Sequence, residues 1–100
     1  MKFADAAITH LAGLTARERS TVVDAIEEQL SYEPLVETRN RKLLKPNPIA
    51  SWELRVGALH VFYDVVSIEP VPGGSSLVRV LAVGKKERNE LRIGGKVIQL

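Results

Sequence analysis

Two runs of alternating apolar and polar residues meet at Gly57, and they are the clearest pattern in the chain. Residues 52–56 and 60–66 both place an apolar side chain at every second position. This alternation, rich in Val, Trp, Phe and Tyr, is typical of half-buried strands. Side chains of like parity share one face of a strand, so one face packs on a core. The other face of the predicted pair then displays four polar residues, namely Glu53, Arg55, His60 and Asp64.

Apolar residues at helical spacing precede these strands. Residues 4–13 carry alanines and leucines at such spacing, and Gly13 stands where a helix often ends. The sequence Thr15-Ala16-Arg17-Glu18 fits a capping box, which predicts the start of a second helix. Its apolar stripe consists of Val22, Val23, Ile26 and Leu30. Because Pro34 cannot continue a helix, we expect this helix to end near Tyr32 or Glu33.

The remaining segments predict further strands separated by turns. Residues 34–50 are expected to be an irregular, basic loop in which Leu43 and Leu44 turn inward. A turn cluster spans 70–74, and the nearly continuous apolar run 77–83 predicts a central strand buried on both faces. A charged connector, 84–89, follows, and Gly94-Gly95 predicts a tight hairpin. Residues 1–100 therefore predict one α+β domain, with a helical hairpin on one face of an antiparallel sheet.

Composition narrows the class of protein. The chain is 45% hydrophobic and 26% charged, as in soluble globular domains, and it has no cysteine. Disulfides and thiolate metal sites are therefore excluded, and an intracellular compartment is favoured. We expect no membrane association, because no apolar run approaches the roughly 20 residues that span a bilayer. The two histidines, His10 and His60, lack metal-ligand spacing, so neither a metal site nor another cofactor is expected.

The net charge of +2 conceals an uneven distribution. Residues 1–38 hold three basic and seven acidic residues, a net charge of −4, whereas residues 39–100 hold eleven basic and five acidic residues, a net charge of +6. A basic half on a small domain indicates a polyanion or an acidic protein as partner. An unevenly charged, solvated surface with no partner gives the same counts, and charge alone leaves both interpretations open.

Four segments, in this order and spacing, resemble the RelE/ParE superfamily of bacterial toxin-antitoxin systems. They are RKLL (41–44), WELRVG (52–57), VFYDV (61–65) and LAVGKKERNEL (81–91). The resemblance implies an N-terminal helical hairpin on a curved antiparallel sheet, in a small, basic, cytoplasmic protein. It also implies a cognate antitoxin that wraps and neutralises the toxin. RelE-like members cut messenger RNA in the ribosomal A site, whereas ParE-like members inhibit DNA gyrase.

The resemblance assigns roles residue by residue. Arg55 matches a family arginine, and His60 falls where the family often has arginine. Lys86 and Arg88 match basic positions that follow the glycine of VGKKER. Arg92 stands at the position of the expected tail tyrosine, and Glu53 where ribosome-dependent nucleases tend to have lysine. The expected catalytic set is therefore Glu53, Arg55, His60, Lys86 and Arg92, and the expected nucleic-acid-binding set is Arg39, Arg41, Lys42, Lys45, Arg79, Lys85 and Arg88.

The chemistry of RNA cleavage suits residues of the polar face. The ribose 2′-OH must lose a proton, charge on the phosphate must be stabilised, and the leaving 5′-oxygen must gain a proton. We expect Glu53 to serve as base, His60 as acid and the basic residues as the phosphate clamp. The alternative is that Glu53 and Arg55 pair with cross-strand neighbours and that Arg79 pairs with Asp64 or Glu53.

The sequence thus favours a RelE-like endoribonuclease that cuts mRNA with the ribosome. Three alternatives stay open: a ParE-like inhibitor of DNA gyrase, a family member without nuclease activity, and an interaction module whose polar face receives a partner strand or helix.

Overall fold

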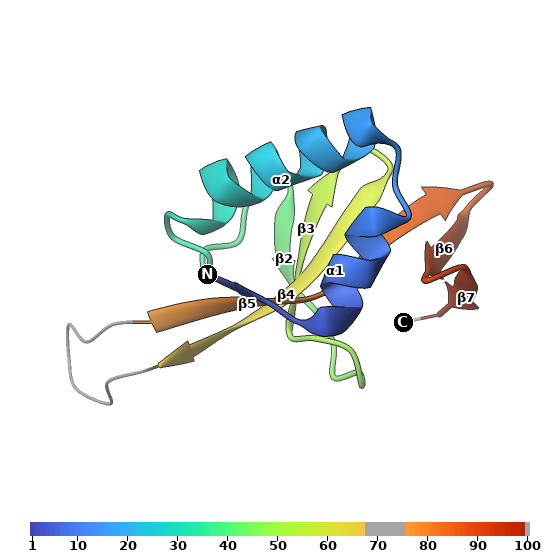
Figure 1. Ribbon diagram of the computed structural model, residues 1–100. Helices are drawn as coiled ribbons and strands as arrows, with labels where there is room; N and C mark the ends of the chain where they lie inside the picture. Colours follow the sequence, from blue (N-terminus) through green and yellow to red (C-terminus); the bar gives the residue numbers. More distant parts are fainter. Residues whose placement is uncertain (68–75, 100) are drawn as a thin grey trace.

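The computed structural model describes residues 1–67 and 76–99, so the predicted turn at 70–74 lies outside the described residues. Within this part of the chain, two helices precede most of a seven-stranded sheet (Figure 1). The elements, in chain order, are β1 (Lys2–Phe3), α1 (Asp5–Ala12), α2 (Ala16–Leu30), β2 (Arg41–Leu43), β3 (Trp52–Val56), β4 (Leu59–Ser67), β5 (Ser76–Glu87), β6 (Glu90–Ile93) and β7 (Lys96–Ile98). The predicted α+β class, with the helices on one face of the sheet, is confirmed.

Local sequence signals set the ends of the helices. Thr15 Oγ1 accepts a hydrogen bond from the Glu18 backbone N–H at 3.1 Å, and Glu18 Oε1 accepts one from the Thr15 N–H at 3.0 Å. The predicted capping box is therefore present at the start of α2. Gly13 caps α1 in the right-handed conformation, and its N–H donates to the carbonyls of Thr9 and His10. The second helix ends at Leu30, about a half-turn before the predicted end.

Neighbouring strands run antiparallel in the order β2-β3-β4-β5-β6-β7, and β1 pairs in parallel with the outer edge of β5. The β3–β4 hairpin turns at Gly57, whose φ of +60° suits glycine. The register places Trp52 opposite Tyr63 and Arg55 opposite His60. The predicted Gly94-Gly95 hairpin is confirmed between β6 and β7, with φ angles of +60° and +81°.

The strands extend further than their sequence pattern indicates. The segment 34–50, predicted to be irregular, contains β2, which pairs with β3. Leu43 in β2 is 56% exposed, so the expectation that it turns inward is wrong. The predicted connector 84–89 is mostly strand, because β5 continues to Glu87 and pairs there with β6. The turn itself consists only of Arg88 and Asn89.

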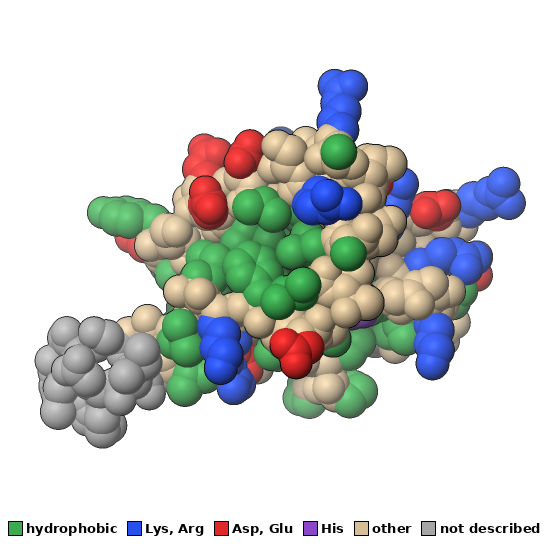
Figure 2. Space-filling model, in the orientation of Figure 1, with side chains coloured by type: hydrophobic (Ala, Val, Ile, Leu, Met, Phe, Trp, Pro, Cys, Tyr) green, Lys and Arg blue, Asp and Glu red, His purple; other side chains and the backbone are tan. Residues whose placement is uncertain are grey.

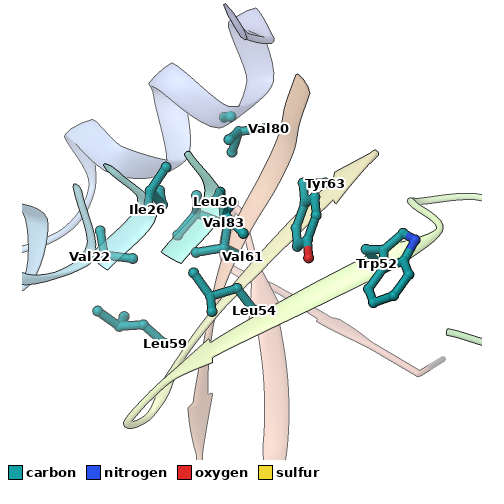
Figure 3. Packing of buried hydrophobic residues seen from close by; sticks show 11 residues of the cluster. Val22, Ile26, Leu30, Trp52, Leu54, Leu59, Val61, Tyr63, Val80 and Val83 are labelled. Atoms are coloured by element: carbon teal, nitrogen blue, oxygen red, sulfur yellow. The ribbon is translucent and has the colours of Figure 1, made fainter. Parts of the chain in front are cut away.

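The core lies between the helices and one face of the sheet (Figure 3). Val22, Ile26 and Leu30 of α2 are fully buried with residues of β3, β4 and β5. Trp52 and Tyr63 stack in this core with ring centroids 6.2 Å apart, which confirms their predicted burial. Burial raises the pKa of Tyr63 to about 12, and its hydroxyl donates to the Pro34 carbonyl at 2.6 Å.

The helices leave part of their own side of the sheet uncovered. Figure 2 shows apolar side chains gathered on this face between α1 and α2.

No helix in the described residues is both long enough and apolar enough to cross a membrane.

Candidate functional site

The face of the sheet opposite the helices carries a Glu–His pair. Glu53 in β3 and His60 in β4 alternate with core residues, and the register confirms that they share a face with Arg55. Glu53 Oε2 lies 3.3 Å from His60 Nδ1, and each side chain is only 12% exposed. Contact with the imidazole lowers the pKa of Glu53, against the opposing effect of burial. The carboxylate is therefore favoured as an anion beside the ring.

The imidazole is held from two sides. Its Nδ1 is buried, and within the described residues this contact with Glu53 is close but lacks the angle of a good hydrogen bond. The ring stacks on the fully buried Phe62 with centroids 6.5 Å apart and planes 18° apart. Since Nδ1 faces the carboxylate, Nε2 is the ring nitrogen that is left to meet a ligand.

Two adjoining hollows lie around this pair. The larger has a volume of about 620 Å³ and the smaller about 430 Å³, and Arg55, His60, Lys86 and Asn89 border both. We call them together the groove. Its larger part lies between the loop that follows β2 and the apolar side chains of Leu91 and Ile98 on the last hairpin. Both volumes lie in the range of ligand-binding clefts, so a short segment of a polymer fits into the groove.

The groove is cationic. The basic residues that border it are Lys42, Lys45, Arg55, Lys86 and Arg88, against one carboxylate, that of Glu53. The salt bridges among the described residues involve none of these five cations. The charges of Lys42 and Arg55 act on Glu53, but this single carboxylate leaves the five cations in excess. An anion such as a phosphate group is therefore the ligand that the electrostatics favour.

Arg41, predicted to bind nucleic acid, lies elsewhere and has a structural role. It is 8% exposed, and its Nη1 donates to the Gln29 carbonyl at 2.7 Å and to the Tyr32 carbonyl at 2.9 Å. These carbonyls are at the C-terminal end of α2, where a cation is favourable. Arg39 is exposed but borders neither hollow.

Three other predicted cations are paired away from the groove. Arg79 makes a two-pronged ion pair with Asp64, at 2.8 and 2.7 Å, as the alternative interpretation of the sequence anticipated. Lys85 reaches Glu18 of α2 at 2.6 Å, on the helical side of the sheet. Arg92 is opposite Lys85 in the register, so it shares that side, and its Nη2 lies 3.3 Å from Glu90.

Asn89 and the apolar border of the groove are contributions that the sequence did not indicate. Asn89 follows Arg88 in the β5–β6 turn and borders both hollows. A two-residue connection that ends in Asn is a hairpin signal, but it becomes visible only once β5 is extended to Glu87.

Comparison of the chain with models of protein families, with curated proteins and with solved structures finds no match. The geometry of the groove and the resemblance of the four sequence segments are therefore the observations from which a function can be proposed.

Proposed function

We propose that the protein is the toxin of a bacterial toxin-antitoxin system, a RelE-like endoribonuclease that cuts mRNA with the ribosome in the cytoplasm. The observation that supports this most is the contact between Glu53 and His60 beside five cations that have no ion-pair partner among the described residues. A general acid–base group beside a phosphate-binding groove is what RNA cleavage requires.

The geometry changes the roles expected for the pair. Glu53 has a lowered pKa and is committed to the imidazole, so it is poorly suited to take a proton from substrate. We assign it to orienting His60 and to stabilising the imidazolium, and we assign His60 Nε2 as the base. The ribose 2′-oxygen gives its proton to Nε2 and forms a bond to the adjacent phosphorus, and the bond from phosphorus to the 5′-oxygen breaks.

The leaving oxygen needs a proton, and the phosphate needs positive charge. Lys86 borders both hollows together with His60, and its ammonium group is the proposed proton donor to the 5′-oxygen. Arg55 and Arg88 would hold the nonbridging phosphate oxygens. The products are a 2′,3′-cyclic phosphate and a 5′-hydroxyl, and no water or metal enters the balance of atoms.

Mapping of mRNA 5′ ends in a reaction with ribosomes tests the proposal. The wild-type protein should generate new 5′-hydroxyl ends, and His60→Gln should reduce cleavage by at least about a hundredfold. Glu53→Gln should also reduce cleavage while leaving RNA affinity within a few-fold. Arg92→Ala is the matched control, because this arginine lies on the other side of the sheet. Full cleavage by His60→Gln would refute the assigned chemistry.

Salt dependence tests the role of the cations separately. If all five contact phosphates of a single strand, the logarithm of the binding constant should fall with the logarithm of salt concentration with a slope of up to roughly −3.5. A slope near zero would contradict phosphate binding.

One observation favours the gyrase alternative. The nucleases of the family have a tyrosine in the tail at the position of Arg92, and Arg92 faces away from the groove. The groove therefore receives no side chain from a position that the resemblance expects to be catalytic. Absence of mRNA cleavage by the wild-type protein, together with inhibition of gyrase supercoiling, would support a ParE-like inhibitor. Absence of both effects would support a member without activity.

An acidic antitoxin is the partner that the groove favours. Five cations without ion-pair partners in the described residues would repel one another less when a carboxylate-rich segment covers them. Such a segment would also block the access of substrate to His60, so the antitoxin would neutralise the toxin by covering its groove. Protection of the groove cations from chemical modification in the presence of a short acidic protein encoded by a neighbouring gene would support this.

A further inference from the structure

The segment between α2 and β2 exposes apolar side chains that the core does not use. Tyr32 is 76% exposed, Leu35 55% and Val36 46%, and the three lie within a short stretch of chain. Glu33 and Glu37 stand beside them, and neither carboxylate has an ion-pair partner in the described residues. Single exposed apolar residues are common, whereas a cluster with a polar rim is typical of an interaction site. We call residues 32–37 the apolar–acidic segment.

Two buried side chains hold the backbone of this segment. Arg41 Nη1 donates to the Tyr32 carbonyl at 2.9 Å, and the Tyr63 hydroxyl donates to the Pro34 carbonyl at 2.6 Å. Between these two carbonyls, Glu33 has a φ of +51°, a left-handed conformation that costs free energy in a residue other than glycine. The surrounding contacts impose this conformation, so the exposed side chains stand on a fixed backbone. Binding through such a surface loses little conformational entropy.

The groove is the surface of this protein that complements the segment. The segment has two carboxylates among apolar side chains, whereas the groove has five cations and an apolar border that includes Leu91 and Ile98. Figure 1 shows the end of α2 and the β6–β7 hairpin on opposite sides of the molecule, and the Tyr63 hydroxyl holds the segment on the helical side of the sheet. The segment therefore cannot reach its own groove, and the groove that it fits belongs to another molecule.

We propose that a second copy of this chain places its apolar–acidic segment in the groove, so that the protein associates with itself and covers His60. The contact joins two different surfaces, so a pair of molecules makes it twice, or longer assemblies form where it does not close. A tyrosine buries about 150–250 Å², against roughly 800 Å² per partner in a standard interface, so we expect a Kd of about 10 µM or weaker. The interface stands without the proposed function, whereas the inhibition of RNA cleavage that it implies rests on that function.

Sedimentation velocity of the full chain tests the inference. Between about 1 and 300 µM protein at about 0.05 M salt, the weight-average sedimentation coefficient should rise with concentration. At about 0.5 M salt it should rise less, because salt screens the attraction between the carboxylates and the groove cations. The Glu33→Lys, Glu37→Lys protein should stay monomeric. Its matched control is the Asp24→Lys, Glu27→Lys protein, which has the same change of charge at exposed positions of α2 and should associate like the wild type.

A mixture of two variants tests whether the segment meets the groove. The Lys86→Gln, Arg88→Gln protein has a weakened groove and should also stay monomeric. Mixed with the Glu33→Lys, Glu37→Lys protein it should form one-to-one pairs, because one partner keeps the groove and the other keeps the segment. Circular dichroism melting checks that each variant is folded.

Three results would overturn the inference: a monomeric wild type at every concentration, association that survives the segment substitutions, or a mixture that stays monomeric. Association as expected, in a wild-type protein that neither binds nor cleaves RNA, would refute the proposed function and support the interface.

Discussion

Replacing Arg41 with methionine separates a structural role from a nucleic-acid-binding role at one position. The guanidinium of Arg41 is buried and donates two hydrogen bonds to carbonyls at the end of α2. The last turn of α2 contains no basic residue of its own, so this cation comes from a strand eleven positions beyond the helix end. Methionine keeps an apolar stem of similar length but removes both donors and the charge.

The size of the effect follows from these contacts. Hydrogen bonds that involve a charged group contribute about 1.5–3 kcal/mol each, and the interaction with the helix dipole adds about 0.3–1 kcal/mol. Arg41 Nε is buried without a hydrogen-bond partner in the described residues, and removing this group recovers about 1–3 kcal/mol. We therefore expect the free energy of unfolding to fall by about 2–4 kcal/mol, which lowers Tm by roughly 10–30 °C in a domain of this size.

Thermal unfolding followed by circular dichroism measures this change. Lys42→Met is the matched control, because its side chain is exposed on the opposite face of the same strand, and its Tm should correspond to a stability change within about 0.5 kcal/mol. In an RNA-binding assay at a temperature below the Tm of both variants, we expect Lys42→Met to have the larger effect. Lys42→Met should weaken binding, whereas Arg41→Met should leave the affinity of the folded protein unchanged.

The opposite pattern would refute the reasoning. An Arg41→Met protein that melts within a couple of degrees of wild type and binds RNA weakly would mean that this arginine contacts nucleic acid and does not support the helix end.

Two further predictions concern the junction of α1 with β5 and β6. The Val83 N–H donates to His10 Nδ1 at 3.2 Å, and burial lowers the pKa of His10 below its usual 6.5. The unfolded chain therefore binds a proton at His10 more readily than the folded protein does. The stability that neutral His10 contributes is complete above about pH 6.5 and is lost as the pH falls through its folded-state pKa. Over that range the urea midpoint of unfolding should fall in the wild-type protein and fall less in His10→Gln. An added Cβ at Gly84 would lie 2.9 Å from Ile93 Cγ1, so Gly84→Ala should cost about 1–3 kcal/mol in thermal unfolding. Gly13→Ala is its control and should be neutral or stabilising by up to about 1 kcal/mol, since Gly13 is right-handed with its nearest atom at 3.5 Å; equal losses in the two variants would contradict the argument from space.

Local sequence patterns were sufficient to predict much of the fold and half of the candidate site. Period-two alternation fixes which side chains share a face of one strand, and the single glycine between two runs fixes a hairpin. The prediction that Glu53, Arg55 and His60 share one face of the sheet is therefore confirmed by the register. The capping box of Thr15 and Glu18 is equally local, because both partners lie within one helical turn.

The missed features depend on pairing over long distances in the chain. β2 becomes a strand because β3 offers it backbone partners, although its own residues show no alternation. That pairing turns Arg41 towards the helices and Lys42 towards the groove. Likewise β5 continues beyond its apolar run because β4 and β6 pair with it, which sends Lys85 and Lys86 to opposite faces.

The sequence by itself thus determined the class of fold, the helix start and the three polar residues at the centre of the groove. Only the tertiary structure decided which basic residues remain without an ion-pair partner in residues 1–67 and 76–99, because Arg79, Lys85 and Arg92 are paired by neighbours that folding brings to them. The physical reason is that a strand's own geometry sets the direction of a side chain, whereas its electrostatic partner is set by the register between strands and by the helix that packs against them.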